Sequence, residues 1–560
     1  MTGLAELVVA VLDCQATGAG PERGHLLELG WARMQASGEA PPVVRAALTQ
    51  LPFGETIPGP VARLTGLSDD DLLDARTPGE VWATLRADVA PATTAVIHYA
   101  RFEESFARPL HAAMTGGEAF PFQVICTHAI ARRLWPDLPR CGLRAVAGYL
   151  GYPAEQLRRS AGHVGATAHV WAHVVPKLRA EHGIEGLESL QAWLAEPVER
   201  SGVRVYPMPR DKRLALPETP GVYRMLRSNG DVLYIGKATS LRRRVNGYFQ
   251  KQSKIPERTL EMLSQARDVD ISPTRTALEA ALLETDEIKR HAPPYNVALR
   301  GSGRSLWYAS RGFASLSPER SPHHPIGPLS SAWWPGRYAA LLQALQGGED
   351  RTKALVAALG HGADEAEPAV LLRGFDELQH RLPPGGFTDD RMMMRFGALR
   401  WAERKAQAKV PDCDEPPEAV EEDTEAERWD PERVVEALED LVLIVAHAVR
   451  RAAWLRRLSE SSIAWSEPGR GAARHVLVLR AGRIEARDRI APGALPPLAP
   501  GVSRPTSERY ASFDLATYDR LRVLTTELRR IAVGRASVEI RVGPGRPLSG
   551  PRVQRTLDWV

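Results

Sequence analysis

The chain has little cysteine and no cysteine-rich motif. Only four cysteines occur among its 560 residues, at positions 14, 126, 141 and 413, and no two of them are spaced as CxxC. This scatter argues against a disulfide framework and a cysteine-rich zinc site, and it fits a reducing cytoplasm.

Long apolar runs are also missing. No stretch of about 18 uncharged apolar residues occurs, so we expect no membrane span and no membrane partner. The initial stretch MTGLAELVVAVLDCQ has no basic segment, and Asp13 ends its short apolar run. It predicts a buried strand rather than a signal peptide.

What is present is ordinary globular composition, with 44% hydrophobic and 25% charged residues. At about 150 residues per domain, the length predicts three or four domains. The net charge of +4 conceals a basic block, because residues 201–300 hold 18 Lys and Arg against 11 Asp and Glu. Such a block indicates a polyanionic partner, and a solvated basic face remains the alternative.

Strand-like and helix-like patterns alternate along the chain and predict an α/β multidomain fold. We expect an α/β domain, a connector, a compact domain, a mostly helical region, an acidic linker and an α+β region. In that order, these segments span residues 1–180, 181–210, 211–300, 301–410, 411–430 and 431–560.

Two strand-like segments flank Asn229-Gly230, which predicts a hairpin with a two-residue type I′ turn. The resulting register places Tyr223 opposite Gly236. Because side chains alternate along strands, Tyr223 and Tyr234 share a face as diagonal neighbours, roughly 7–8 Å apart. Two phenols beside a glycine favour a site, and plain aromatic packing remains the alternative.

The following segment predicts a short helix. One of its sides is apolar and packs, and the neighbouring side carries a guanidinium and a phenol. Thr239 or Ser240 can cap it, and Arg244 and Tyr248 form an i, i+4 pair. Arginine suits phosphate because its planar fork can bind in a bidentate manner. The packed stripe consists of Leu241, Val245 and Phe249.

A second helix is predicted from Ala277, because Thr276 and Glu279 have capping-box spacing, and Pro293-Pro294 stops it. Glu284 borders its apolar stripe. A carboxylate there can hold a hard cation such as Mg²⁺, and a solvated helix-edge glutamate is the alternative. The stripe consists of Leu278, Ala281, Leu282 and Ile288.

These segments together resemble the GIY-YIG nucleases, and above all the nuclease domain of the UvrC and Cho type. The resemblance rests on LPETPGVY, LYIGKATSLRRRVNGYF and ALLETDEIKRHAPPYN, in this order, over about residues 214–300. It implies that Tyr234 acts as general base or orients the attacking water, with Tyr223 beside it and Lys237 assisting. Arg244 and Tyr248 would hold the scissile phosphate.

The same resemblance implies that Glu284 is the protein ligand of one Mg²⁺ or Mn²⁺ and that Asn296 orders the edge of the active site. We therefore expect a metal-dependent endonuclease that nicks one strand of DNA. By resemblance it would act in nucleotide excision repair with other repair proteins, in a bacterial-type cytoplasm at the nucleoid.

The N-terminal segment resembles the DEDDh exonucleases, as in DnaQ. The resemblance rests on VAVLDCQATG, HLLELG, HYARFEESF and HVGATAHVW, over about residues 7–175, and it implies an RNase H-like exonuclease fold.

The catalytic pattern of that family is degraded in this chain. Asp13 and His163 are retained, but Gln15 replaces a glutamate, Glu103 replaces an aspartate and Ala168 replaces another aspartate. Two Mg²⁺ ions need several carboxylate oxygens, so we expect little or no exonuclease activity. The domain can persist as a module that binds a DNA end or a partner.

Two weaker patterns complete the sequence analysis. His169 and His173 are spaced i, i+4 near His163 and could bind a transition metal, with packed or surface histidines as the alternative. The C-terminal QRTLDWV resembles a sliding-clamp-binding peptide, with a terminal strand or tail as the alternative. Its three anchors would be Gln554, Leu557 and Trp559.

Two other functions remain as rivals. A 3′→5′ exonuclease with an accessory GIY-YIG domain would give ladder products from a free 3′ end. A non-catalytic DNA-binding scaffold would bind DNA without cutting it.

Overall fold

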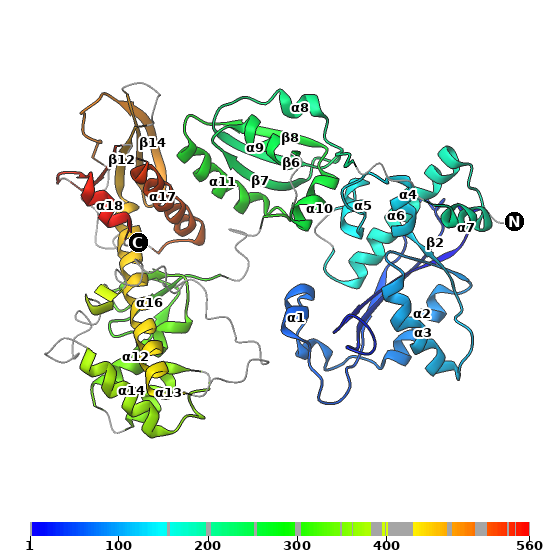
Figure 1. The fold of residues 1–560 in the computed structure, drawn as a ribbon, viewed down its shortest axis with the longest axis horizontal. Coiled ribbons are helices and arrows are strands. Elements are labelled where there is room, and N and C mark those ends of the chain that lie inside the picture. The colour runs from blue at the N-terminus through cyan, green and yellow to red at the C-terminus, as the bar shows by residue number, and fades with distance from the viewer. Residues whose placement is uncertain are drawn as a thin grey trace. The chain divides into compact units, whose positions relative to one another are not determined.

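The computed structural model forms two compact units (Figure 1). The first comprises residues 1–275 with 291–298, and the second comprises 276–290 with 299–560. None of the helices among the described residues is long and apolar enough to cross a membrane. The described residues are 3–153, 157–197, 203–250, 255–296, 304–347, 350–360, 362–381, 395–397, 399–400, 429–466, 473–498, 512–534, 537–543 and 545–558.

The first unit begins with a five-stranded sheet in the order β3-β2-β1-β4-β5. Strand β1 is antiparallel to β2 and parallel to β4. This mixed order is the RNase H-like arrangement that the sequence resemblance implies. The strands are β1 (Val9–Ala16), β2 (Leu26–Met34), β3 (Arg45–Leu48), β4 (Thr94–Ile97) and β5 (Gln123–Cys126).

Both faces of this sheet are covered. Val9 and Val11 pack in one cluster with Trp171 of α6, whereas Ala10 and Leu12 pack in another with residues of α2 and α3. The two clusters follow from alternation along the apolar run of β1. The helical elements are α1 (Gly59–Thr65), η1 (Asp69–Leu72), α2 (Pro78–Val89), α3 (Arg101–Thr115), α4 (Thr127–Leu134), α5 (Leu143–Tyr149), α6 (Ser160–His182) and α7 (Leu187–Ala195).

The first unit continues with a three-stranded antiparallel sheet in the order β7-β6-β8. Helix α11 follows β8 and begins, as predicted, after Thr276, whose hydroxyl accepts a hydrogen bond from the amide of Glu279 at 3.1 Å. The elements of this part of the first unit are α8 (Arg210–Leu214), β6 (Gly221–Leu226), β7 (Val232–Ala238), α9 (Leu241–Gly247), α10 (Glu257–Gln265) and β8 (Asp268–Pro273). Helix α11 (Ala277–His291) follows them in the chain but belongs, up to Arg290, to the second unit.

The predicted type I′ turn in this sheet is wrong. A type I′ turn needs positive φ at both central residues, but of Asn229 and Gly230 only Gly230 has it, at +88°. The amide of Gly230 donates to the carbonyl of Arg227, and a bulge between Met225 and Leu226 shifts the pairing. The loop is therefore a three-residue turn of the bulged kind, and the register beyond the bulge is as predicted.

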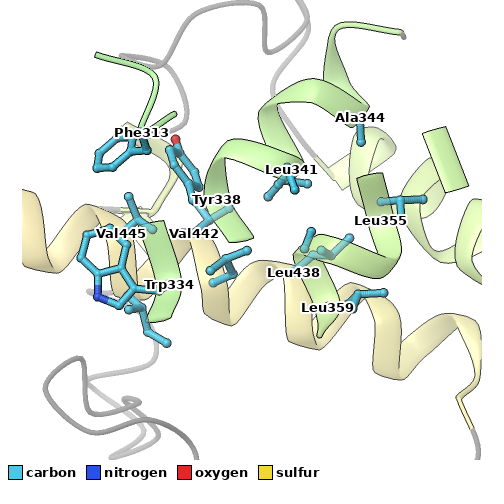
Figure 2. Close-up of a cluster of buried hydrophobic side chains, with 14 of the residues drawn as sticks. Phe313, Trp334, Tyr338, Leu341, Ala344, Leu355, Leu359, Leu438, Val442 and Val445 are labelled. Carbon is cyan, nitrogen blue, oxygen red and sulfur yellow. The ribbon is translucent and has the colours of Figure 1, made fainter. Parts of the chain in front are cut away.

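The second unit contains a small sheet, β10-β9-β11, and a helical cluster built on the 28-residue helix α16. In Figure 2, Leu438 and Val442 of α16 lie beside Leu341 of α12 in this buried cluster. Most of the predicted linker over residues 411–430 lies outside the described residues, as does Cys413. The elements are β9 (Trp307–Ala309), β10 (Leu316–Ser317), β11 (Ile326–Leu329), α12 (Trp333–Leu345), α13 (Arg351–Leu359), α14 (Pro368–Arg381) and α16 (Pro431–Leu458).

The C-terminal part of this unit is an antiparallel sheet in the order β14-β13-β12-β15-β16, packed on helices α17 and α18. Its core includes Trp465, Leu477, Leu524 and Ile540. The elements are β12 (Ser461–Trp465), β13 (Arg474–Arg480), β14 (Arg483–Ile490), α17 (Leu515–Val533), β15 (Val538–Val542), β16 (Leu548–Ser549) and α18 (Pro551–Asp558).

Candidate active site

Three tyrosines from different elements meet on one face of the β7-β6-β8 sheet. The ring centroid of Tyr223 lies 6.1 Å from that of Tyr234 and 6.2 Å from that of Tyr248, and the last two are 6.4 Å apart. The hydroxyls of Tyr223 and Tyr248 are 2.8 Å apart, within hydrogen-bond distance. The structure thus brings together two predicted strand tyrosines and the predicted helix tyrosine.

Gly236 makes this arrangement possible. A Cβ atom built there would lie 2.4 Å from the hydroxyl oxygen of Tyr223 and 2.8 Å from a ring carbon of Tyr234. The space left by the missing side chain of Gly236 is therefore filled by the Tyr223 ring, which is fully buried. Burial, followed by the neighbouring Tyr248 and Tyr234, raises the pKa of Tyr223 well above its ordinary value, so it is a neutral phenol.

Helix α9 places a cation at the rim of this cluster. Ser240 caps the helix by accepting from the amide of Arg243, and Leu241 and Val245 bury its apolar stripe. The exposed guanidinium of Arg244 lies 5.3 Å from the ring centroid of Tyr248. Its interaction with the oxygen of Tyr223 raises the pKa of Arg244, which is therefore fully charged.

Asn296 fixes the backbone between two of the site positions. Its amide oxygen accepts from the backbone amide of Ile235, and its amide nitrogen donates to the carbonyl of Ile235, both at 2.9 Å. Ile235 lies between Tyr234 and Gly236 on β7. Asn296 is buried, and this two-point contact holds the strand segment that presents the Tyr234 ring.

Lys237 lies on β7 and Glu284 on α11. Lys237 pairs with Val222 across the strands and is half-buried. Glu284 is half-buried on α11, and Leu278 and Leu282 of the predicted apolar stripe on that helix are buried. A single carboxylate of this kind suits Mg²⁺, which retains most of its waters.

In the N-terminal fold, the retained site residues contact each other directly. His163 Nδ1 on α6 lies 3.2 Å from Asp13 Oδ1 on β1. Burial lowers the pKa of His163, but the hydrogen bond and charge of Asp13 outweigh it, and the net direction is upward. Gln15 instead donates its amide to the carbonyl of Arg158 at 2.8 Å.

The donors at this site do not fit two divalent cations. Ala168 offers no oxygen, and Gln15 is neutral and is used as a donor. No group of three His, Cys, Asp or Glu side chains able to hold a metal ion occurs among the described residues. Burial and the charge of Asp13 raise the pKa of Glu103 to about 9, so this carboxyl is protonated at neutral pH.

The predicted histidine pair is not a metal site either. His169 Nε2 contacts the carbonyl of Leu150 at 3.1 Å, and His173 Nδ1 contacts the carbonyl of His169 at 2.8 Å. The two rings stack with centroids 4.0 Å apart. Both histidines are thus used in packing and backbone contacts, the alternative stated for them.

The predicted clamp-binding tail is wrong for its central anchor. Leu557 is fully buried in the C-terminal core on α18, so it is not offered to a partner pocket. Gln554 is exposed on the same helix, and Trp559 lies outside the described residues.

A buried arginine that sequence patterns did not indicate joins the two folds of the first unit. Arg227 donates to Gln265 Oε1 through Nε and Nη2 at 3.1 and 2.5 Å, and to the carbonyl of Tyr152 at 2.9 Å. Gln265 in turn donates to the hydroxyl of Tyr295 at 2.5 Å, next to Asn296. An arginine before a turn carries no local signal of burial, so only the tertiary contact reveals it.

Comparisons with known proteins identify sequences that are similar to parts of this chain. Residues 219–297 match the family model of the UvrC-like GIY-YIG domain. A putative bifunctional exonuclease/endonuclease protein of Mycobacterium tuberculosis is 30% identical over 317 residues, which are 55% of this chain and 47% of that protein. UvrABC system protein C of a Psychrobacter species is 53% identical over 92 residues, 16% of this chain and 15% of that protein.

Among solved structures, the magnesium-bound N-terminal endonuclease domain of UvrC from Thermotoga maritima is 35% identical, with a TM-score of 0.15. The match covers 16% of this chain and 94% of the Thermotoga maritima chain. The chain thus spans about half or less of the length of the curated relatives it matches. The segment that matches the UvrC-like GIY-YIG model follows a fold whose sheet has the order β3-β2-β1-β4-β5.

Proposed function

We propose that the protein is a divalent-cation-dependent endonuclease that nicks one strand of DNA in nucleotide excision repair. The observation that carries the proposal is the cluster of Tyr223, Tyr234 and Tyr248 beside the charged Arg244, inside the segment that matches the UvrC-like model. An aromatic core alone would not need a guanidinium at its rim.

Each of the predicted site residues has a separate role in phosphodiester hydrolysis. Tyr234 is half-buried at the edge of the cluster and orients or deprotonates the attacking water, with help from Lys237. The hydroxyl of the neutral Tyr223 lies 2.8 Å from the hydroxyl of Tyr248 and holds it in position. Tyr248 then presents a hydrogen-bond donor, and Arg244 a cation, to the scissile phosphate. Preorganised donors of this kind stabilise charge that develops in the transition state.

Glu284 would hold one Mg²⁺ or Mn²⁺, and the cation would supply Lewis-acid stabilisation of the phosphate and the leaving oxygen. Asn296 maintains the position of Tyr234 through the backbone of Ile235. The basic surroundings attract the DNA backbone, whose binding is therefore weakened by salt.

The N-terminal fold serves, in this proposal, as a DNA-end or partner-binding module without exonuclease activity. The protonated Glu103 and the direct contact between Asp13 and His163 support this view. Because its substrate is DNA and its relatives are bacterial repair proteins, we place the protein in a bacterial cytoplasm, at the nucleoid and with other excision-repair proteins as partners.

The test is cleavage of end-labelled duplexes, with and without a bulky adduct, in Mg²⁺ or Mn²⁺. Glu284→Gln is compared with Glu279→Gln, a matched change on the same helix that keeps the capping spacing. We expect a discrete nick that Glu284→Gln abolishes and Glu279→Gln retains, and its adduct dependence decides the repair role. A one-nucleotide ladder that survives Glu284→Gln would identify the exonuclease rival, and binding without cutting would identify the scaffold.

A further inference from the structure

We infer that the C-terminal fold positions the proposed metal ligand Glu284 by holding helix α11, with Asp519 and Arg520 of α17 as the positioning residues. The inference rests on the proposed role of Glu284. Residues 276–290 belong to the same compact unit as the C-terminal fold, although they directly follow β8 of the GIY-YIG segment in the chain.

The apolar part of the contact buries one side of α11. Leu278 and Leu282 are each only 1% exposed, and they share one hydrophobic cluster with Trp454 of α16 and Tyr518 of α17. Removing two leucine side chains from water stabilises the contact through the hydrophobic effect. Helix α11 is therefore part of a hydrophobic core with α16 and α17.

Two ion pairs between α11 and α17 also fix how the two helices are oriented. Arg520 donates through Nε and Nη2 to Asp286 Oδ1 at 3.0 and 2.7 Å. Lys289 Nζ lies 2.6 Å from Asp519 Oδ2, and Arg304 reaches the same oxygen at 2.8 Å. Asp519 is 1% exposed, so its charge depends on these cations, and loss of one would leave a poorly paired buried carboxylate.

The geometry of a helix connects these contacts to Glu284. Leu278, Leu282, Asp286 and Lys289 are spaced by four, four and three residues and form one stripe. Glu284 is two residues from both Leu282 and Asp286, roughly 200° around the helix axis. Holding the stripe fixes the rotation and axial position of α11, and it thereby sets where Glu284 points.

Local packing within a nuclease domain would not need this arrangement. Arg520 lies 234 positions after Asp286 in the chain, on a fold that carries none of the proposed catalytic side chains. The consequence is that the C-terminal fold sets the cation dependence of nicking. If a partner displaced α17, helix α11 would be held less firmly and the position of Glu284 would be less well defined.

A charge swap in the full-length protein tests the inference. Arg520→Asp, Asp286→Arg and the double variant are compared by hydrogen exchange of the α11 amides and by the Mg²⁺ concentration that gives half-maximal nicking. Coupling between contacting charges justifies an expectation of about tenfold faster exchange and about tenfold higher Mg²⁺ demand in Arg520→Asp. The double variant should recover both to within about twofold.

Arg487→Asp is the matched control, because Arg487 is exposed on β14 of the same fold, and it should change neither quantity. Unchanged α11 exchange in Arg520→Asp, or altered exchange with unaltered Mg²⁺ demand, would overturn the inference, as would failure of the double variant to recover. If the wild-type protein does not nick, the proposed function fails, and the exchange data alone still decide whether α17 holds α11.

Discussion

The hydroxyl of Tyr223 lies 2.8 Å from the hydroxyl of Tyr248, and the Tyr223 ring covers the Cα of Gly236. These contacts bring together side chains from strand β6, its hairpin partner β7 and the C-terminal end of helix α9. A fully buried phenol needs a hydrogen-bond partner, and Tyr248 provides it. The position of Tyr248 is therefore determined by the core of the domain as well as by its own helix.

Gly236→Ala should damage this cluster. The new methyl group would lie 2.4 Å from the Tyr223 oxygen, and the ring cannot retreat because it is buried on all sides. We expect a loss of about 1–3 kcal/mol, measured as a lowered first transition in scanning calorimetry. Gly247→Ala, where a Cβ meets nothing within 4 Å, is the control and should be neutral or slightly stabilising.

Tyr248→Phe should affect both stability and nicking. It removes the hydrogen bond between the Tyr248 hydroxyl and the buried Tyr223 hydroxyl, at a cost of about 1–3 kcal/mol. Tyr223→Phe and the double variant complete a cycle in which the two stability losses are not additive. If Tyr248 holds the phosphate, nicking by Tyr248→Phe should also fall about 100-fold in single-turnover assays. Additive stability losses would mean that the two hydroxyls do not depend on each other.

Local patterns predicted the elements of this site well. The apolar run ending at Asp13 gives β1, and the capping residue Thr276 and Pro293-Pro294 bracket α11. The shared face of Tyr223 and Tyr234 follows from the register, which survives even though the turn type was wrong. Register depends on strand alternation, whereas turn type depends on the backbone angle of one residue.

Long-range contacts could not be predicted in this way. Asp286 and Arg520 are separated by 234 positions, and neither charge carries a local signal of its partner. Leu557 shows the same limit, because a short apolar pattern near a chain end does not distinguish a core residue from a partner-binding anchor. Its burial in the C-terminal core depends on strands far from it in sequence.

Glu103→Gln should stabilise the protein in alkaline solution. The folded pKa of about 9 lies above the ordinary value of 4.5, so between these values the folded state binds more protons than the unfolded state. Stability therefore falls as the pH rises through this window. At pH 8 the variant should gain on the order of 1–3 kcal/mol, with no gain near pH 4, as measured by denaturation across pH.

Glu118→Gln, an exposed change just beyond the same helix, is the control and should show no such pH dependence. Added Mg²⁺ should not close the gap between wild type and Glu103→Gln, because the donor set does not fit two cations. A Mg²⁺-dependent stabilisation of the wild type at pH 8 that Glu103→Gln lacks would contradict this view.

Arg227→Met should loosen the contact between the exonuclease-like fold and the GIY-YIG fold. Arg227 is 2% exposed and donates to both Gln265 and the carbonyl of Tyr152, so its loss removes the hydrogen bonds that link these two residues and leaves the buried Gln265 oxygen without its arginine donor. We expect a cost of about 2–4 kcal/mol, seen as a lower calorimetric transition and faster proteolysis between the folds. Arg224→Met, three residues earlier on β6, removes a partly exposed pair with Asp270 and should cost less than about 1 kcal/mol. Equal costs for the two variants would show that the buried arginine does not join the folds.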